Sequence, residues 1–215
     1  MRHTAIAGAA ILATAATTHA NIRITEVMSS SGSTADWIEV TNYGSTAIDL
    51  TGWKMDDGSF NFAAAVNLNG IASIGAGESV IFSESAAGAA IPTFQTFWGS
   101  LSTVQVGYYS GSGVGFSSGG DGACLFDASG NILSQVSFGA ATSGASFFYG
   151  WDALGNLDAN YNGLVSTVGT IGTQITTTSA DALGNVGSLG SAIGVPTPGA
   201  LALLGLAGLG ARRRR

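Results

Sequence analysis

Residues 22–57 read IRITEVMSSSGSTADWIEVTNYGSTAIDLTGWKMDD, and this stretch decides the fold class. It consists of short segments rich in β-branched and aromatic residues, separated by Gly, Ser, Asn and Asp. The first segment alternates between two sets of side chains, Ile22, Ile24 and Glu26 against Arg23, Thr25 and Val27. A period of two is that of a β-strand, so the stretch predicts short strands joined by tight turns.

The same pattern continues beyond this stretch, with further short apolar segments at 78–84, 123–127 and 131–138. No window outside the two ends of the chain holds a helical period of useful length. Many short strands with glycine-rich turns predict an all-β sandwich or barrel. The alternation predicts nine buried inner-face residues: Ile22, Ile24, Ile38, Val40, Leu50, Val80, Phe82, Leu125 and Val136.

Three segments of similar sequence, 127–131, 152–156 and 181–185, begin with Asp and end with Gly-Asn. An Asp side chain can accept hydrogen bonds from the backbone ahead of it, and Gly can adopt the left-handed conformation that closes a hairpin. We therefore predict structural turns here, because the segments between them are dissimilar.

The N-terminal segment, MRHTAIAGAAILATAATTHA at 1–20, carries one basic residue followed by a small-residue apolar stretch. It ends on Thr18-His19-Ala20, which fits a signal-peptidase site with cleavage between Ala20 and Asn21. The alternative is a first core helix. The segment predicts a signal peptide and an exported protein that begins at Asn21.

The charge of the body differs from that of the whole chain, which is −6. All 13 acidic residues lie between Glu26 and Asp181. Arg23 and Lys54 are the only basic residues of the body between the two end segments, so the side chains of the body carry a net charge of −11. An acidic body offers no basic patch for nucleic acid or anionic lipid. Nucleic-acid binding is therefore not expected.

The C-terminal end combines an unbroken Gly, Ala and Leu run at 199–211 with a terminal basic cluster, Arg212, Arg213, Arg214 and Arg215. As a helix this run would reach about 20 Å, short of a hydrocarbon core of roughly 30 Å. Arginine clusters mark the cytoplasmic side of a membrane segment. An amphipathic helix is the alternative, but the run has no polar face. We predict a short membrane anchor that leaves the body outside.

Four residues precede this run, Val195, Pro196, Thr197 and Pro198. The order of this motif, an apolar segment and an arginine cluster resembles the PEP-CTERM sorting signal of Gram-negative bacteria. The resemblance implies recognition by an exosortase-type enzyme, anchoring in the inner membrane during sorting, and an association with exopolysaccharide. The final location implied is the cell surface or extracellular matrix. Thr197 stands where the family usually has Glu, which puts cleavage at this motif in question.

The order of the strand motifs also resembles a known family. IRITEVM, DWIEVTNYG, AIDLTGWKMDD, AGESVIFSES, FWG and SSGGDGACLFDASGNILSQVSFG are similar in order to the lamin-tail domain. The resemblance implies an immunoglobulin-like β-sandwich over 21–190, followed by a linker at 191–198 and the anchor segment at 199–215. The family carries no catalytic motif, so the resemblance implies a protein that is not an enzyme.

Few residues can support catalysis in the mature chain. Both histidines, His3 and His19, fall in the signal segment, which excludes His-based triads and His-ligated metals. Lys54 is expected to be a surface cation near Asp56. Cys124 is the only cysteine, and we interpret it as a small core residue rather than a reactive thiol.

Carboxylates remain as candidate ligands. Loops rich in Asp and Asn suit Ca²⁺. The GGDG sequence at 119–122 resembles a glycine-rich calcium-binding repeat, but it is a single copy without the nonapeptide period. The candidate calcium ligands are Glu26, Glu39, Asp56, Asp57 and Asp121. Alternatively, Glu26 and Glu39 are buried acids that accept backbone hydrogen bonds. Trp151, with Tyr149 and Tyr161, is either core or a sugar-stacking surface.

The sequence therefore predicts an exported, cell-surface or matrix-associated structural or adhesive β-sandwich without catalytic residues and without a required cofactor. The alternative is a module that binds, or weakly hydrolyses, exopolysaccharide or another glycan through a pair of acids. Expected partners are an exosortase-type enzyme, the inner membrane, and exopolysaccharide or other surface proteins.

Overall fold

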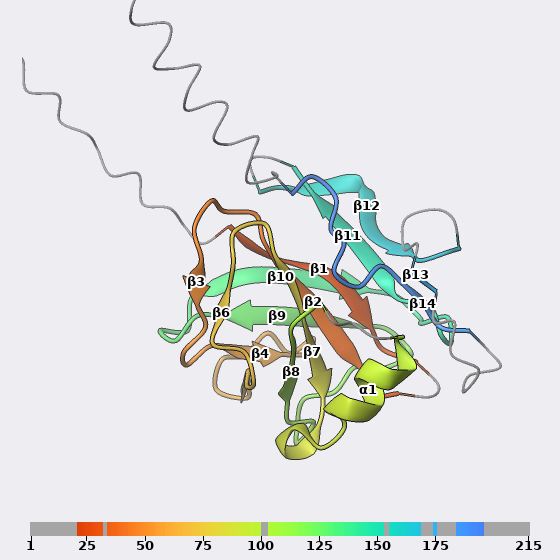
Figure 1. The fold of residues 1–215 in the computed structure, drawn as a ribbon, viewed down its shortest axis with the longest axis horizontal. Coiled ribbons are helices and arrows are strands. Elements are labelled where there is room, and N and C mark those ends of the chain that lie inside the picture. Colours follow the sequence, from red (N-terminus) through yellow and green to blue (C-terminus); the bar gives the residue numbers. More distant parts are fainter. Residues whose placement is uncertain are drawn as a thin grey trace, which may run out of the picture.

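The computed structural model describes residues 21–31, 34–99, 103–152, 155–168, 174–175 and 184–195. Two β-sheets pack face to face in these residues (Figure 1). The larger sheet has the order β12-β11-β1-β2-β7-β8. Its strands are β1 (Ile22–Met28), β2 (Trp37–Asn42), β7 (Ser79–Glu84), β8 (Val106–Tyr109), β11 (Phe147–Trp151) and β12 (Leu157–Val165).

The smaller sheet has the order β10-β9-β4-β5. Its strands are β4 (Lys54–Asp56), β5 (Val66–Asn67), β9 (Asp121–Phe126) and β10 (Ile132–Phe138). Two short pairs complete the strands, β3 (Ile48–Asp49) with β6 (Ser73–Ile74), and β13 (Gln174–Ile175) with β14 (Val186–Gly187). The predicted all-β sandwich is thereby confirmed.

The main hydrophobic core fills the space between the two sheets. All nine residues that the alternation predicted as inner-face are buried, with exposed fractions of 3 % or less. We call the face of the six-stranded sheet that contacts the smaller sheet its inner face, and the opposite face its outer face. Burial of these side chains is the main stabilising contribution to the sandwich.

A β-bulge in β1 overturns part of the predicted alternation. The register of β1 against β2 shifts between Ile24 and Glu26, so that Thr25 and Glu26 both stand opposite Glu39. In a bulge the extra residue reverses the alternation beyond it. Val27, rather than Glu26, therefore joins Ile22 and Ile24 in the inner core.

The outer face of the six-stranded sheet is also covered. One helix, α1 (Ile91–Phe97), lies over it after a 3₁₀ turn η1 (Ala86–Gly88) (Figure 1). A second cluster forms there from Met28, Trp37, Ile81, Phe94, Phe97, Trp98 and Leu189. The rings of Trp37 and Trp98 meet edge to face, with centroids 5.6 Å apart. Because both faces of the sheet are covered, β2 is buried along its whole length and β7 is buried at every residue except Glu84.

The helix α1 was not predicted. The FWG motif at 97–99 was expected among the strands, and this expectation is wrong. Phe97 ends α1 and Trp98 caps it. The helix has only seven residues, too few to display a helical period, and it carries Pro92 in its first turn. It belongs to the crossover between β7 and β8, which pair in parallel and so cannot be joined by a tight hairpin.

The predicted turns form at two of the three sites. Asp127 and Asp152 each accept main-chain hydrogen bonds from the Asn four residues ahead, at 2.9 and 2.8 Å. Gly130 and Gly155 adopt φ of 85° and 80°. These turns close the β9–β10 and β11–β12 hairpins. The third segment lies outside the described residues except for Gly184 and Asn185.

The two ends of the chain fall outside the described residues. These include the predicted signal peptide, residues 196–198 of the sorting motif, the apolar run and the four terminal arginines. Within the ranges that the structure describes, no helix has the length and apolar character needed to cross a membrane.

Candidate functional site

The most unusual polar feature of the fold is a pair of buried acids, Glu26 and Glu39, on the outer face of the six-stranded sheet. They are Cα partners across β1 and β2, and neither side chain is exposed to solvent. The bulge at Thr25 creates this arrangement, since a regular strand would place Glu26 on the inner face. We refer to these two residues as the glutamate pair.

Glu26 holds the segment that follows β14. Both of its carboxylate oxygens accept the main-chain N–H of Ser188, at 2.9 and 3.0 Å. The Ser188 hydroxyl donates to Oε2 at 3.0 Å, and the Ser146 hydroxyl donates to Oε1. Glu26 therefore links β1, the start of β11 and the C-terminal segment.

Glu39 binds the same segment two residues further on. Its Oε2 accepts the Gly190 N–H at 2.5 Å, and its Oε1 accepts the Thr25 hydroxyl at 2.6 Å. Thr25, Thr41 and Ser79 continue as a chain of hydroxyl contacts across the sheet, at 2.8 and 2.7 Å. The glutamate pair thus accepts main-chain hydrogen bonds. This agrees with the interpretation of Glu26 and Glu39 as buried acids rather than calcium ligands.

Burial changes the proton affinity of the glutamate pair. Loss of solvent raises the pKa of Glu26 to about 7, against the opposing effect of its hydrogen bonds from Ser146 and Ser188. Loss of solvent raises the pKa of Glu39 to about 8, and the negative charge of Glu26 adds to this effect. Because like charges cannot both be held cheaply in a buried site, the pair holds a proton more tightly than exposed carboxyls do.

The glutamate pair is closed off from solvent and saturated with internal partners. A general acid or base must reach the proton that it transfers in a substrate, and the segment through Ser188 and Gly190 covers this pair. The arrangement therefore acts structurally, by fastening the C-terminal segment to the sheet.

The other predicted calcium ligands lie in the smaller sheet and its loops. Asp121 accepts the main-chain N–H groups of Gly58 and Ser117, at 2.9 and 2.8 Å. Asp56 accepts the Asn61 N–H at 2.6 Å, and Asp57 accepts the Ser59 N–H at 3.1 Å. The structure thus divides the five candidates between two sheets. Among the described residues, no group of three or more His, Cys, Asp or Glu side chains is arranged to hold a metal ion.

Cys124 and Lys54 occupy structural positions. Cys124 is fully buried beside Phe126, and burial, with a further effect of Asp56, raises the pKa of its thiol to about 12. The Lys54 ammonium lies 4.9 Å from the ring centroid of Phe62. The interpretation of Cys124 as a core residue is confirmed.

The tryptophans are mainly core residues as well. Trp37, Trp53 and Trp98 are buried, with exposed fractions of 6 % or less. Trp151 is half-buried: its indole N–H donates to the Ile24 carbonyl at 2.9 Å, and the Arg23 guanidinium lies 5.2 Å from its ring centroid. Its neighbour Tyr149 is fully buried. Trp151 and Tyr149 therefore do not form an open stacking surface.

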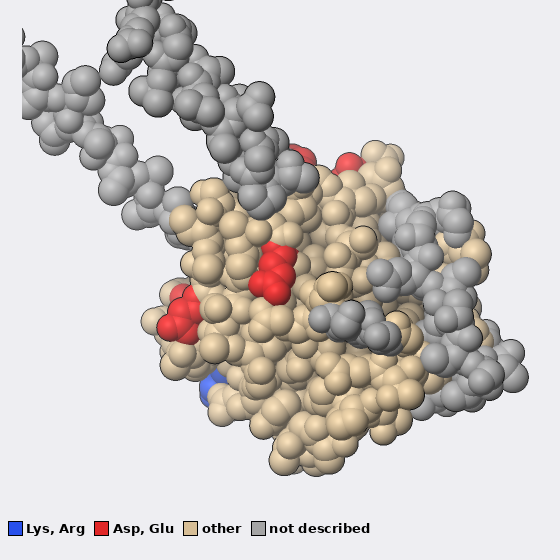
Figure 2. Space-filling view, in the orientation of Figure 1, with Lys and Arg blue, Asp and Glu red and all other residues tan. Residues whose placement is uncertain are grey.

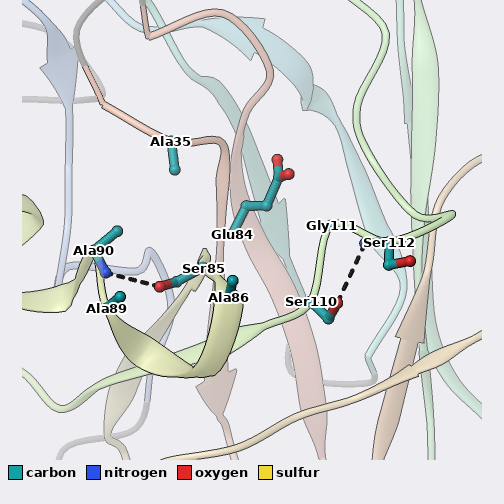
Figure 3. Close-up of a pocket in the computed structure, with 9 residues that line it drawn as sticks. All are labelled: Ala35, Glu84, Ser85, Ala86, Ala89, Ala90, Ser110, Gly111 and Ser112. Atoms are coloured by element: carbon teal, nitrogen blue, oxygen red, sulfur yellow. Dashed lines mark hydrogen bonds between the residues drawn. The ribbon is translucent and has the colours of Figure 1, made fainter.

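A surface cavity of about 550 Å³ lies at the end of β7 and β8 (Figure 3). Ala35, Glu84, Ser85, Ser110, Gly111 and Ser112 contribute to its lining. Burial and the nearby charge of Glu84 raise the pKa of Asp36, beside this cavity, to about 7. Sequence reasoning missed Glu84, because only the pairing of β2 with β7 brings it beside Asp36.

The comparison with family models matches residues 15–140 to the Lamin Tail Domain. The match covers β1 to β10, while β11, β12 and the segment held by the glutamate pair follow it in the chain. Among curated proteins, none matches the chain. Since the matched residues are more than half of the 215, and the sandwich is of the expected immunoglobulin-like type, the chain belongs to the lamin tail domain family.

Proposed function

We propose that this protein is an exported structural or adhesive module of a bacterial cell surface or extracellular matrix. One observation carries the proposal. An acidic β-sandwich lies between an N-terminal segment typical of export and a C-terminal order of VPTP, apolar run and four arginines. These segments imply passage through the inner membrane and sorting by an exosortase-type enzyme.

The body is suited to a role based on contact rather than catalysis. The chain belongs to the lamin tail domain family, and its glutamate pair and thiol serve internal packing. Figure 2 shows that acidic and basic side chains occupy small, separate areas of the face in view, amid uncharged surface. Uncharged polar surface favours neutral partners, such as exopolysaccharide or other surface proteins, over nucleic acid.

The role is tested by the intact mass and cellular fraction of the protein recovered from its host. We expect a mass that begins at Asn21, and we expect loss of the residues after the VPTP motif in the surface or matrix fraction. Full-length protein found only in the cytoplasm would contradict the proposal.

A matched pair of variants separates sorting from export. Thr197→Glu restores the residue that the sorting family usually has and should increase the processed fraction. Pro196→Ala should leave the protein membrane-bound and unprocessed. If the protein is exported but neither variant changes its processing, the proposed surface role stands and the proposed exosortase-type partner is contradicted.

A further inference from the structure

Three oxygen-bearing side chains meet at one end of the six-stranded sheet. Asp36 directly precedes β2, Glu84 ends β7 and Tyr109 ends β8. The Glu84 N–H donates to the Asp36 carbonyl at 2.8 Å, and Glu84 and Tyr109 are Cα partners in the parallel β7–β8 pair. These residues therefore occupy neighbouring positions on three adjacent strands.

All three side chains belong to the inner-face side of the sheet. Ile38 and Phe82 lie in the inner core, and Asp36 and Glu84 are each two residues away from them along their strands. Tyr109 is itself a member of that core. Since neighbouring strands are about 4.8 Å apart, the three side chains stand next to one another on this face of the sheet.

In the described part of the chain, no positive charge offsets the two acids. Of the two basic residues of the body, Arg23 donates to the Ile22 carbonyl at 2.8 Å and packs on Trp151. Lys54 packs on Phe62 in the other sheet. The charge of Glu84 adds to burial in raising the pKa of Asp36. Two partly buried acids thus stand together without a cationic partner among the described residues.

The Tyr109 hydroxyl supplies an independent observation. It is fully buried and has no hydrogen-bond partner in the described part of the chain. Burial raises its pKa, and the charges of Asp36 and Glu84 add to this effect. The strand register places Tyr109 beside Glu84, which in turn lies beside Asp36. Yet the hydroxyl donates to neither of them. The phenol is therefore a buried polar group whose hydrogen-bonding capacity is unused within the described part of the chain, which is rare in folded proteins.

Glu84 is the member of this cluster that lines the surface cavity. Two serine hydroxyls of the cavity lining already have main-chain partners: Ser85 accepts the Ala90 N–H at 2.8 Å, and Ser110 accepts the Ser112 N–H at 3.3 Å (Figure 3). Gly111 lies so close to the Glu84 carboxylate that a Cβ atom there would collide with it. The lack of a side chain at position 111 therefore accommodates the Glu84 carboxylate.

We propose that Asp36 and Glu84, with Tyr109 beside them on the neighbouring strand, bind one Ca²⁺ ion at this end of the sandwich. The donors are oxygen atoms, which favours a hard cation over transition metals. Ca²⁺ accepts irregular oxygen sets completed by water, whereas Mg²⁺ requires near-octahedral geometry. The ion would neutralise the two acids and fix the junction between β2, β7 and β8.

The test is a titration of Ca²⁺ into the metal-free full chain, followed by calorimetry and by the melting temperature, with Mg²⁺ in parallel. We expect one Ca²⁺ per chain and a higher melting temperature, and a smaller effect of Mg²⁺. Glu84→Gln and Asp36→Asn should each weaken the affinity for Ca²⁺ at least about tenfold. Without metal, both variants should melt above the parent at neutral pH, because the repulsion is relieved.

Two controls make the result specific. Asp49→Asn removes one exposed acid from β3 and changes the net charge equally, so it should leave Ca²⁺ binding unchanged. Asp121→Asn tests the GGDG loop. Absence of Ca²⁺ binding by the parent would overturn the proposal, as would binding that survives both Glu84→Gln and Asp36→Asn or that is lost in Asp121→Asn alone.

Discussion

Glu26 and Glu39 face each other across β1 and β2, fully buried, and together they accept main-chain hydrogen bonds from Ser188 and Gly190. Two acids of adjacent strands thereby hold a segment about 150 residues further along the chain. A pair of carboxylic acids can do this at low cost only while it retains at least one proton. The attachment of the segment is therefore coupled to pH.

The free energy of unfolding should fall as the pH rises from about 4.5 to 8. Burial raises the pKa of Glu26 and Glu39 from 4.5 to about 7 and about 8. Over this range the folded state holds more protons than the unfolded state, so stability decreases with pH. The contribution is fully present below pH 4.5 and is lost above the folded pKa values. Urea denaturation at several pH values measures it.

Glu39→Gln is the matched variant for this pH effect. Its amide can accept the Gly190 N–H and donate to the Thr25 hydroxyl, so it imitates the protonated acid without titrating. We expect a shallower dependence of stability on pH, with a slope reduced by up to about 1.4 kcal/mol per pH unit for the one proton removed. An unchanged slope would show that this pair does not control the pH dependence.

The sequence predicted the inner core well, because period-two alternation reports directly on which residues face the second sheet. It failed at Glu26, where a single extra residue in β1 moves the side chain to the other face. Nothing in the pattern IRITEV distinguishes a bulged strand from a regular one. Bulges are set by how the partner strand pairs, which is tertiary information.

The candidate sites were harder to predict than the fold. Burial with backbone hydrogen bonds is one of the two interpretations that the sequence allows for Glu26 and Glu39, the other being calcium ligands. The sequence cannot name their partners, Ser188 and Gly190, which lie far along the chain. Asp36 and Glu84 are brought together only by the pairing of β2 with β7. Sequence proximity had instead grouped Asp56 and Asp57 with the glutamates, and the structure places those aspartates in the other sheet and its loop.

The C-terminal segment should contribute strongly to stability through Leu189. This side chain is fully buried against the outer-face cluster that includes Trp37 and Trp98. Leu189→Ala should lower the free energy of unfolding by about 2–5 kcal/mol. Ile193→Ala, at a position 38 % exposed, is the control and should have a small effect. Equal effects of the two variants, measured by urea denaturation, would contradict an integral role for this segment.

Gly107 in β8 should tolerate no side chain. A Cβ atom there would come within 2.4 Å of the Asn69 carbonyl oxygen and 2.8 Å of the Phe82 ring. Gly107→Ala should therefore destabilise the fold by about 1–3 kcal/mol through overpacking. Gly139→Ala is the control, because a Cβ atom added at Gly139 would have no atom within 4 Å. Thermal melting of both variants measures the difference. A Gly107→Ala variant as stable as the parent would contradict the close packing of β8 against Asn69 and Phe82.

The four arginines at 212–215 should determine whether the protein stays in the membrane. The apolar run before them would span about 20 Å as a helix, which is shorter than the hydrocarbon core of roughly 30 Å. The run alone therefore does little to determine its depth in the bilayer. Placing one arginine in the bilayer centre costs about 2.5–3.5 kcal/mol on insertion scales. Four together should resist translocation and hold the body on the outer side.

Replacing Arg212, Arg213, Arg214 and Arg215 together by Ser should therefore release the protein into the periplasm or medium with its body still folded. Replacing all four by Lys keeps the charge and should leave the protein in the membrane fraction, which makes it the matched control. Cell fractionation with intact mass distinguishes the two. A four-Ser variant that remains with the membranes would show that the apolar run alone is the anchor, because removal of the charges would then have changed nothing that holds it.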